Sequence, residues 1–145
     1  MKTKTGNFYE CVIRYDKMME NGLMKKVSET YCVEAASFGA AEMRISEETV
    51  AFSSGEFEIK KINPAPYNEV FINDGEMFYK AKLQFVTFDE TTMKEKTTTV
   101  SYLVRAADFA NALDTVQKVM GGTGLDYTTA QIAESRVLEI FDDED

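Results

Sequence analysis

Apolar residues follow two spacings along the chain, and the spacings occur in the same order twice. Alternation at every second residue predicts half-buried strands, and apolar positions three or four residues apart predict helices, with Ser37 and Asp108 as their N-caps. The first half is predicted to hold strands over 8–15 and 25–34, a helix from Phe38 to about Glu48, and strands over 56–62 and 67–72. The second half is predicted to hold strands over 77–88 and 96–105, a helix from Phe109 to about Met120, and strands over 127–135 and 136–141.

A tight hairpin turn is predicted at Asn21-Gly22, because both central residues of the favoured two-residue turn need a positive φ. Such a turn pairs residues whose numbers add to 43, so Cys11 is expected to face Cys32, although a bulge would shift this register by one. The two cysteines are interpreted as small, partly buried thiols, and a disulfide is the alternative.

Three blocks of the first half recur in the second half at a nearly constant offset. Y-C-V-E-A-A-S-F-G-A-A at 31–41 matches Y-L-V-R-A-A-D-F-A-N-A at 102–112, which lies 71 residues later. The blocks F-Y-E-C and E-V-F recur 70 residues later as F-Y-K-A and E-I-F. We therefore interpret the chain as a tandem duplication of a β-β-α-β-β unit, with repeats over about 8–72 and 78–141.

The expected fold is α+β, with eight strands in antiparallel sheets, two helices and pseudo-two-fold symmetry. A repeat of about 70 residues would be marginally stable alone, so we expect one globular domain over 1–141 that is built from both repeats. Residues 1–7 are expected to be a frayed lead-in, and residues 142–145 an acidic tail.

The composition excludes several classes of function. Asp and Glu total 25 against 16 Lys and Arg, which gives a net charge of −9 and argues against the broad basic surface of a duplex-DNA binder. The chain has no histidine and two cysteines, so histidine-based catalysis is excluded and no zinc site is expected. We expect no enzymatic activity and no cofactor. The sequence shows neither a signal peptide nor a long apolar run, which predicts a cytoplasmic protein without a membrane partner.

The motifs F-Y-E-C-x-x-R-Y (8–15), K-K-V-S-E-T-Y-x-V-x-A-x-S-F-x-x-A-E-x-R-I (25–45) and G-E-F-E-I (55–59) resemble a family of uncharacterised proteins. That family is labelled a domain of unknown function and is encoded by Bacteroides-type gut bacteria and by their phages and mobile elements. The resemblance covers nearly the whole chain and implies a source but no activity. It favours nucleic-acid handling, interference with a host system, or a structural part of a virion.

Exposed aromatic side chains flanked by Lys or Arg on a sheet can stack unpaired bases. The candidate nucleic-acid-binding residues are Tyr9, Arg14, Tyr15, Lys80, Lys82, Lys94 and Lys96. The alternative is that the aromatic residues belong to the core, because Tyr9 and Tyr15 share a strand face with Cys11 and Ile13.

The last four residues, Asp142, Asp143, Glu144 and Asp145, resemble the acidic C-terminal tails of single-stranded-DNA-binding proteins, which compete with nucleic acid for a basic groove. The sequence departs from those tails because it ends on Asp145 instead of an apolar residue, and a solubilising end is the alternative. Our first hypothesis is a non-enzymatic binder of single-stranded nucleic acid with a regulatory tail. The alternatives are a protein-interaction module that inhibits a host factor, including an acidic DNA mimic, and a virion-associated protein; a homodimer is possible for each.

Overall fold

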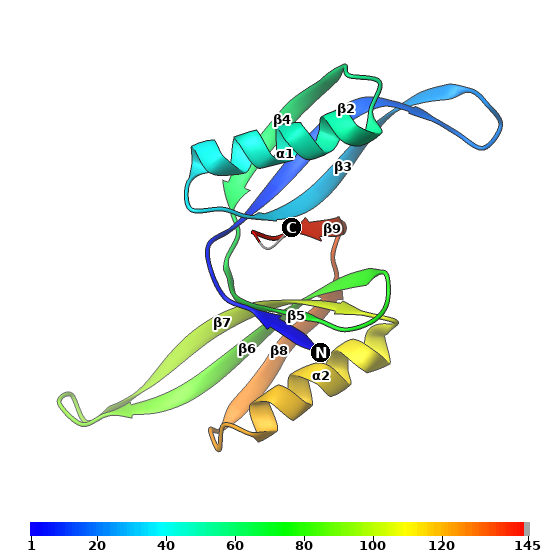
Figure 1. The fold of residues 1–145 in the computed structure, drawn as a ribbon. Coiled ribbons are helices and arrows are strands. Elements are labelled where there is room, and N and C mark those ends of the chain that lie inside the picture. Colours follow the sequence, from blue (N-terminus) through cyan, green and yellow to red (C-terminus); the bar gives the residue numbers. More distant parts are fainter. Residues whose placement is uncertain (144–145) are drawn as a thin grey trace. The chain divides into compact units, whose positions relative to one another are not determined.

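The computed structural model describes residues 1–143, which form an α+β fold with two helices and two mixed sheets (Figure 1). The first part of the chain forms β1 (Lys2–Lys4), β2 (Phe8–Met18), β3 (Met24–Glu34), α1 (Phe38–Phe52), β4 (Phe57–Pro64) and β5 (Tyr67–Ile72). The second part forms β6 (Met77–Asp89), β7 (Lys94–Ala106), α2 (Phe109–Gly121), β8 (Tyr127–Glu134) and β9 (Val137–Phe141).

The chain divides into two compact units, and each unit is assembled from separate segments. Unit 1 contains Met1–Thr5 and Pro66–Ser135, and its five strands lie in the order β1-β5-β7-β6-β8. Unit 2 contains Gly6–Ala65 and the segment from Arg136, and its four strands lie in the order β4-β2-β3-β9. Strand β5, which follows the β2-β3-α1-β4 segment, therefore belongs to the unit 1 sheet, and β9, which follows β6-β7-α2-β8, belongs to the unit 2 sheet.

The expectation of purely antiparallel sheets is wrong at these two completing strands. Strand β5 pairs with β7 in parallel, and β9 pairs with β3 in parallel. A parallel neighbour requires a long connection. Strand β6 lies between β5 and β7 along the chain, and residues 35–136 lie between β3 and β9.

Unit 2 forms its core between α1 and one face of its sheet (Figure 1). Ser37 caps the helix as predicted, because its Oγ accepts a hydrogen bond of 3.1 Å from the backbone N–H of Ala40. Ala41 and Ile45 are fully buried against β2 and β3. The helix begins at Phe38 as predicted, and Phe38 is 52% exposed. The predicted end near Glu48 was wrong, since the helix continues to Phe52.

The β2–β3 hairpin is one residue out of the predicted register. Its turn has three residues, Glu20 to Gly22, and Gly22 supplies the positive φ of 81°. The numbers of paired residues therefore add to 42, so Cys11 lies opposite Tyr31 and Cys32 lies opposite Glu10. The cysteines point to opposite faces of the sheet and are both free and buried, which confirms the thiol interpretation. Burial, and secondarily the carboxylate of Glu10, raises the pKa of Cys11 to about 11.

Unit 1 packs α2 on the β6–β7 face through Ala112, Val116 and Met120. Asp108 caps this helix as predicted, by accepting a hydrogen bond of 2.8 Å from the N–H of Asn111. Phe109, the first residue of the helix, is 49% exposed. Gly122 is the C-cap of the helix and has a right-handed backbone conformation, with φ −80°.

The expectation of a frayed start was also wrong. Residues Lys2–Lys4 form β1, which pairs antiparallel with β5 at the edge of the unit 1 sheet, with Lys2 opposite Ile72 and Lys4 opposite Val70. The described residues thus contain nine strands where eight were expected. Polar composition did not reveal this strand, because a sheet edge tolerates polar side chains on both faces.

Candidate functional site

The two tyrosines of the predicted nucleic-acid site lie in or beside the core of unit 2. Tyr15 is 6% exposed and belongs to the buried cluster, and Tyr9 is half-buried and packs against the same cluster. Arg14 is exposed on the opposite face of β2, and it lies opposite Ser28 instead of the predicted Glu29. These three residues therefore do not form one exposed stacking surface.

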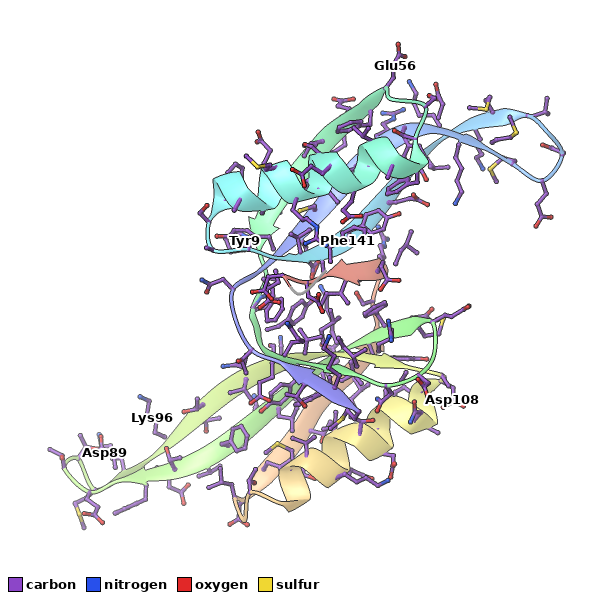
Figure 2. The ribbon with its side chains drawn as sticks, viewed as in Figure 1. Tyr9, Glu56, Asp89, Lys96, Asp108 and Phe141 are labelled. Atoms are coloured by element: carbon purple, nitrogen blue, oxygen red, sulfur yellow. The ribbon has the colours of Figure 1, made fainter. Side chains whose placement is uncertain are left out.

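The four predicted lysines of unit 1 divide between the two faces of the β6–β7 hairpin. Lys80 and Lys82 alternate with the core residues of β6 and point away from α2, and Lys80 Nζ lies 5.9 Å from the centre of the Tyr67 ring. Lys94 and Lys96 pair with Asp89 and Thr87 near the hairpin end (Figure 2), at positions that point to the α2 side. The structure does not bring the two pairs onto one face.

The proposed acidic tail begins inside unit 2. Asp142 is 5% exposed, and its carbonyl oxygen accepts a hydrogen bond of 2.7 Å from Arg44 Nη1. The backbone N–H of Asp143 donates to Glu34 Oε1 at 3.4 Å. Glu144 and Asp145 lie outside the described residues.

Sequence reasoning missed a groove in unit 2 where the hairpin leaves the sheet. The groove has a volume of about 680 Å³, within the roughly 300–1,000 Å³ of small-ligand sites. It is lined by residues 15–18, Met24, Glu29, Tyr31, residues 52–54 and Leu138. The β2–β3 hairpin, the end of α1 and strand β9 thus each contribute to the groove.

Glu29 is the polar centre of this groove. Its side chain is 10% exposed, and Oε1 accepts hydrogen bonds from the hydroxyls of Tyr15 and Tyr31, the latter at 3.0 Å. Lys17 Nζ lies 3.2 Å from Oε2 and is half-exposed. Burial, together with the Glu29 carboxylate, raises the pKa of both tyrosines well above the ordinary value of 10. The hydroxyls therefore stay protonated and remain donors to Glu29.

Tyr15, Tyr31 and Phe52 are aromatic residues of the groove lining. Phe52 contacts Tyr15 edge-on with ring centres 5.5 Å apart, and it contacts Tyr31 at 5.7 Å. Tyr31 also stacks on Phe141 at 5.3 Å, and the guanidinium of Arg44 lies 5.8 Å from the centre of the Phe141 ring. The groove therefore combines an anionic group with aromatic rings, whose faces carry partial negative charge.

The end of α1 adds a negative electrostatic contribution. Phe52 is its last residue, Ser53 is its C-cap, and no basic side chain lies in its last turn. The last carbonyl groups of a helix carry partial negative charge and attract cations within about one turn. Asp16 is a further acid of the groove lining, where Lys17 is the one basic residue.

The corresponding positions of unit 1 lack this polar network. Strands β6 and β7 occupy the same places in their sheet as β2 and β3, and Leu83 lies opposite Val100 where Ile13 lies opposite Glu29. Phe85 stands at the position that corresponds to Tyr15. Because unit 1 builds the same sheet order without the carboxylate, Glu29 is not required by this fold and is a candidate functional residue.

The family model for Domain of unknown function (DUF4494) matches residues 7–143. The chain belongs to this family. No curated protein and no solved structure matches the chain. Among the described residues, this DUF4494 chain has no helix long and apolar enough to cross a membrane and no group of three or more His, Cys, Asp or Glu placed to hold a metal ion.

Each unit of the DUF4494 chain extends a two-stranded arm beyond its sheet. In unit 2, β4 pairs with β2 only as far as Tyr15, so residues 16–26 form a hairpin without further strands, which we call the unit 2 arm. In unit 1, β8 pairs with β6 as far as Phe85, and residues 86–97 form the unit 1 arm. The exposed large apolar residues are Met18, Met19, Leu23 and Met24 on the unit 2 arm, and Val86, Phe88 and Met93 on the unit 1 arm.

Proposed function

We propose that this protein is a non-enzymatic interaction module that binds a protein partner through the unit 2 arm and the groove at its base. The observation that carries this proposal is the exposed apolar surface of the arm. Met18 and Met24 are 67% and 53% exposed and lie opposite each other on the paired strands, and Leu23 is 67% exposed. Contiguous exposed apolar side chains mark interaction surfaces, and flexible methionines adapt to a partner's shape.

The chemistry of the surface favours a basic partner that carries an apolar segment. The arm would bury the partner's apolar side chains, and the groove continues from Met18 and Met24 to the carboxylate of Glu29. The net charge of −9 would attract a basic protein over long range and repel acidic ones. An inhibitor of a basic host factor fits these properties.

The test compares capture by two matched variants. The triple variant Met18→Ser, Leu23→Ser, Met24→Ser alters the unit 2 arm, and the control Val86→Ser, Phe88→Ser, Met93→Ser alters the unit 1 arm. Proteins captured from a host extract would be identified by mass spectrometry, purified, and titrated calorimetrically against both variants. We expect a basic partner to bind the wild-type protein and the control variant with similar affinity. Its affinity for the unit 2 arm variant should be at least tenfold lower, which is roughly the effect of losing one well-packed interface contact.

Equal binding of every partner to the two variants would reject the proposal. Light scattering on the same samples would detect a homodimer, and a dimer that dissociates only in the unit 2 arm variant would assign the arm to self-association instead.

Binding of single-stranded nucleic acid remains a second candidate. It is supported by the exposed Lys80, Lys82 and Gln84, which alternate along one face of β6. Fluorescence anisotropy with a labelled dT oligonucleotide of about 30 nucleotides would test it at low and moderate salt, with full-length protein and with a chain ending at Phe141. Binding that weakens with salt and strengthens when residues 142–145 are removed would support this candidate and a screening role for the tail. The absence of binding by both chains at tens of micromolar protein would exclude it.

We also infer that the chain arose by tandem duplication. The strand orders of the two sheets support this inference. The unit 2 order β4-β2-β3-β9 becomes the unit 1 order β8-β6-β7-β5 when each strand is replaced by the strand at the corresponding place in the other repeat. The offsets of 70 and 71 residues between the matching sequence blocks support it as well. The family resemblance supports a phage or mobile-element source, and the cytoplasmic location predicted from the sequence agrees with an inhibitor of a host factor.

A further inference from the structure

We infer that the groove beside Glu29 binds an organic cation, namely the ammonium group of a lysine that the partner carries. The ammonium group would lie between the carboxylate of Glu29 and the rings of Tyr15, Tyr31 and Phe52. This inference rests on the proposed function only in assigning the lysine to a protein partner. The groove itself would also bind the ammonium group of a small lysine compound. A primary ammonium fits because it carries three donors and one positive charge on a flexible stem.

The carboxylate is held in place to receive a cation. Two tyrosine hydroxyls occupy Oε1, whereas Oε2 accepts only from the half-exposed Lys17 among the hydrogen bonds described. The hydroxyls fix the orientation of the carboxylate without neutralising its charge. Oε2 is therefore the oxygen that an incoming ammonium would meet.

Lys17 marks the position of the ligand. Its Nζ lies 3.2 Å from Oε2, so the chain already places an ammonium at this site. Half-exposed ion pairs of this kind are weak, because solvent screens the charges and the long side chain loses conformational freedom. An ammonium from a partner that also gains contacts with the rings can displace Lys17, which would then return to solvent.

The surroundings of the site favour positive charge. The face of an aromatic ring attracts a cation, and the attraction is stronger when the cation is desolvated. The C-terminal end of α1 adds to the attraction, and Asp16 is an acidic residue of the groove lining. The four-carbon stem of a lysine would lie against the methionines and Leu138, which is 50% exposed at the rim.

The direct test is an NMR titration of ¹⁵N-labelled full-length protein with N-acetyl-lysine methylamide. The neutral control is N-acetyl-norleucine methylamide, which has nearly the same stem without the charge. We expect saturable shifts of amide signals in the groove, including those of Ser53, Ser54 and Leu138, with the lysine compound only. Shifts confined to other regions, or equal shifts with both compounds, would overturn the inference.

Two variants sharpen the test, because the inference predicts that they change the affinity for the lysine compound in opposite directions. Glu29→Gln retains a side chain of the same size but removes the charge, and should weaken binding about tenfold or more. Lys17→Met removes the internal competitor and should strengthen binding roughly two- to fivefold. The matched controls are Glu58→Gln and Lys60→Met, because Glu58 and Lys60 form a similar pair at 3.3 Å on β4, outside the groove, and these should leave affinity unchanged.

The Lys17→Met variant keeps the inference falsifiable if Glu29→Gln folds poorly. Unchanged or weaker binding by the folded Lys17→Met protein would overturn it. If the free compound fails to bind but partner capture still depends on the unit 2 arm, the proposed function stands without the cation site. If the compound binds but no arm-dependent partner exists, the groove is a cation site and the proposed function fails.

Discussion

The hydroxyl of Tyr15 on β2 donates a hydrogen bond to Oε1 of Glu29 on the neighbouring strand, and the two side chains meet on the face that α1 covers. Tyr31 donates to the same oxygen from two residues farther along β3. Two buried hydroxyls therefore depend on one acid, and the acid depends on them for its solvation inside the protein.

Glu29→Ala should destabilise the protein by about 1–3 kcal/mol, because both tyrosine hydroxyls lose their acceptor in a buried place. Glu29→Gln should cost less, since its amide oxygen can still accept a hydrogen bond. Urea unfolding followed by circular dichroism would measure both effects. Glu58→Ala is the control, because Glu58 is exposed and its loss should change the free energy of unfolding by less than about 0.5 kcal/mol. A Glu29→Ala protein as stable as the control variant would show that the network contributes nothing to stability.

Stability should fall as the pH rises above about 10, where tyrosines in the unfolded chain lose their protons. Burial and the Glu29 carboxylate raise the folded-state pKa of Tyr15 and Tyr31. The folded protein therefore retains protons that the unfolded chain releases, so the stabilisation is complete below the unfolded pKa and is lost as the pH rises toward the folded value. Urea unfolding at about pH 8 and pH 10.5 would measure the loss.

The matched variant for this pH effect is Tyr15→Phe with Tyr31→Phe. It should reduce the slope of stability against pH but not abolish it, because burial also raises the pKa of Cys11, Tyr79 and Tyr102. Absorbance at 295 nm, which follows ionised tyrosine during an alkaline titration, should show fewer tyrosines in this variant than in the wild type that lose their protons only when the protein unfolds. A slope identical to that of wild type would contradict the assigned environment of the two tyrosines.

The hairpin register explains why this site was missed from the sequence. The expected two-residue turn paired Glu29 with Arg14 and so placed the acid on the outer face. The extra turn residue moves every pair by one, and a one-residue slip transfers a side chain to the other face. A signal was nevertheless present, because Val27, Glu29 and Tyr31 alternate on one strand and an acid between two apolar neighbours is unusual on a core face.

Helix positions and most strand boundaries followed from local chemistry, whereas the sheet partners did not. Ser37 and Asp108 act as caps through their own side chains, so the sequence near each helix start predicts it. The pairing of β5 with β7 and of β9 with β3 depends on where the chain goes after Ala65 and Ser135. Apolar strands such as Tyr67–Ile72 do not specify which buried neighbour they join, so exchange of the completing strands is invisible to periodicity.

Deletion of residues 1–5 should expose the outer edge of β5. Strand β1 covers this edge through an antiparallel ladder over Lys2–Lys4, and β5 pairs with β7 on its other side. Hydrogen exchange measured by mass spectrometry should therefore become faster in peptides that cover 67–72. Peptides that cover β4 in unit 2 are the internal control and should exchange at the wild-type rate. Unchanged exchange in 67–72 would show that β1 does not protect the sheet in solution.

Gly75 should be the glycine least tolerant of substitution among those with positive φ. It adopts φ +129° between β5 and β6, and a Cβ there would lie 2.4 Å from the carbonyl carbon of Ala106 at the end of β7. The turn is fixed to β7 by Asn73, whose N–H donates to the carbonyl of Arg105 at 3.1 Å, so the backbone cannot easily move away.

Gly75→Ala should therefore destabilise the protein by about 3 kcal/mol or more, from backbone strain together with the clash. Gly55→Ala is the matched control, because Gly55 has φ +96° but open space around the added Cβ, and it should cost only about 1–2 kcal/mol. Urea unfolding of both variants separates the close approach at Ala106 from the backbone conformation alone. Equal losses of stability would show that unit 1 relaxes around the turn, and that the contact between Gly75 and the end of β7 does not constrain the path from β5 to β6.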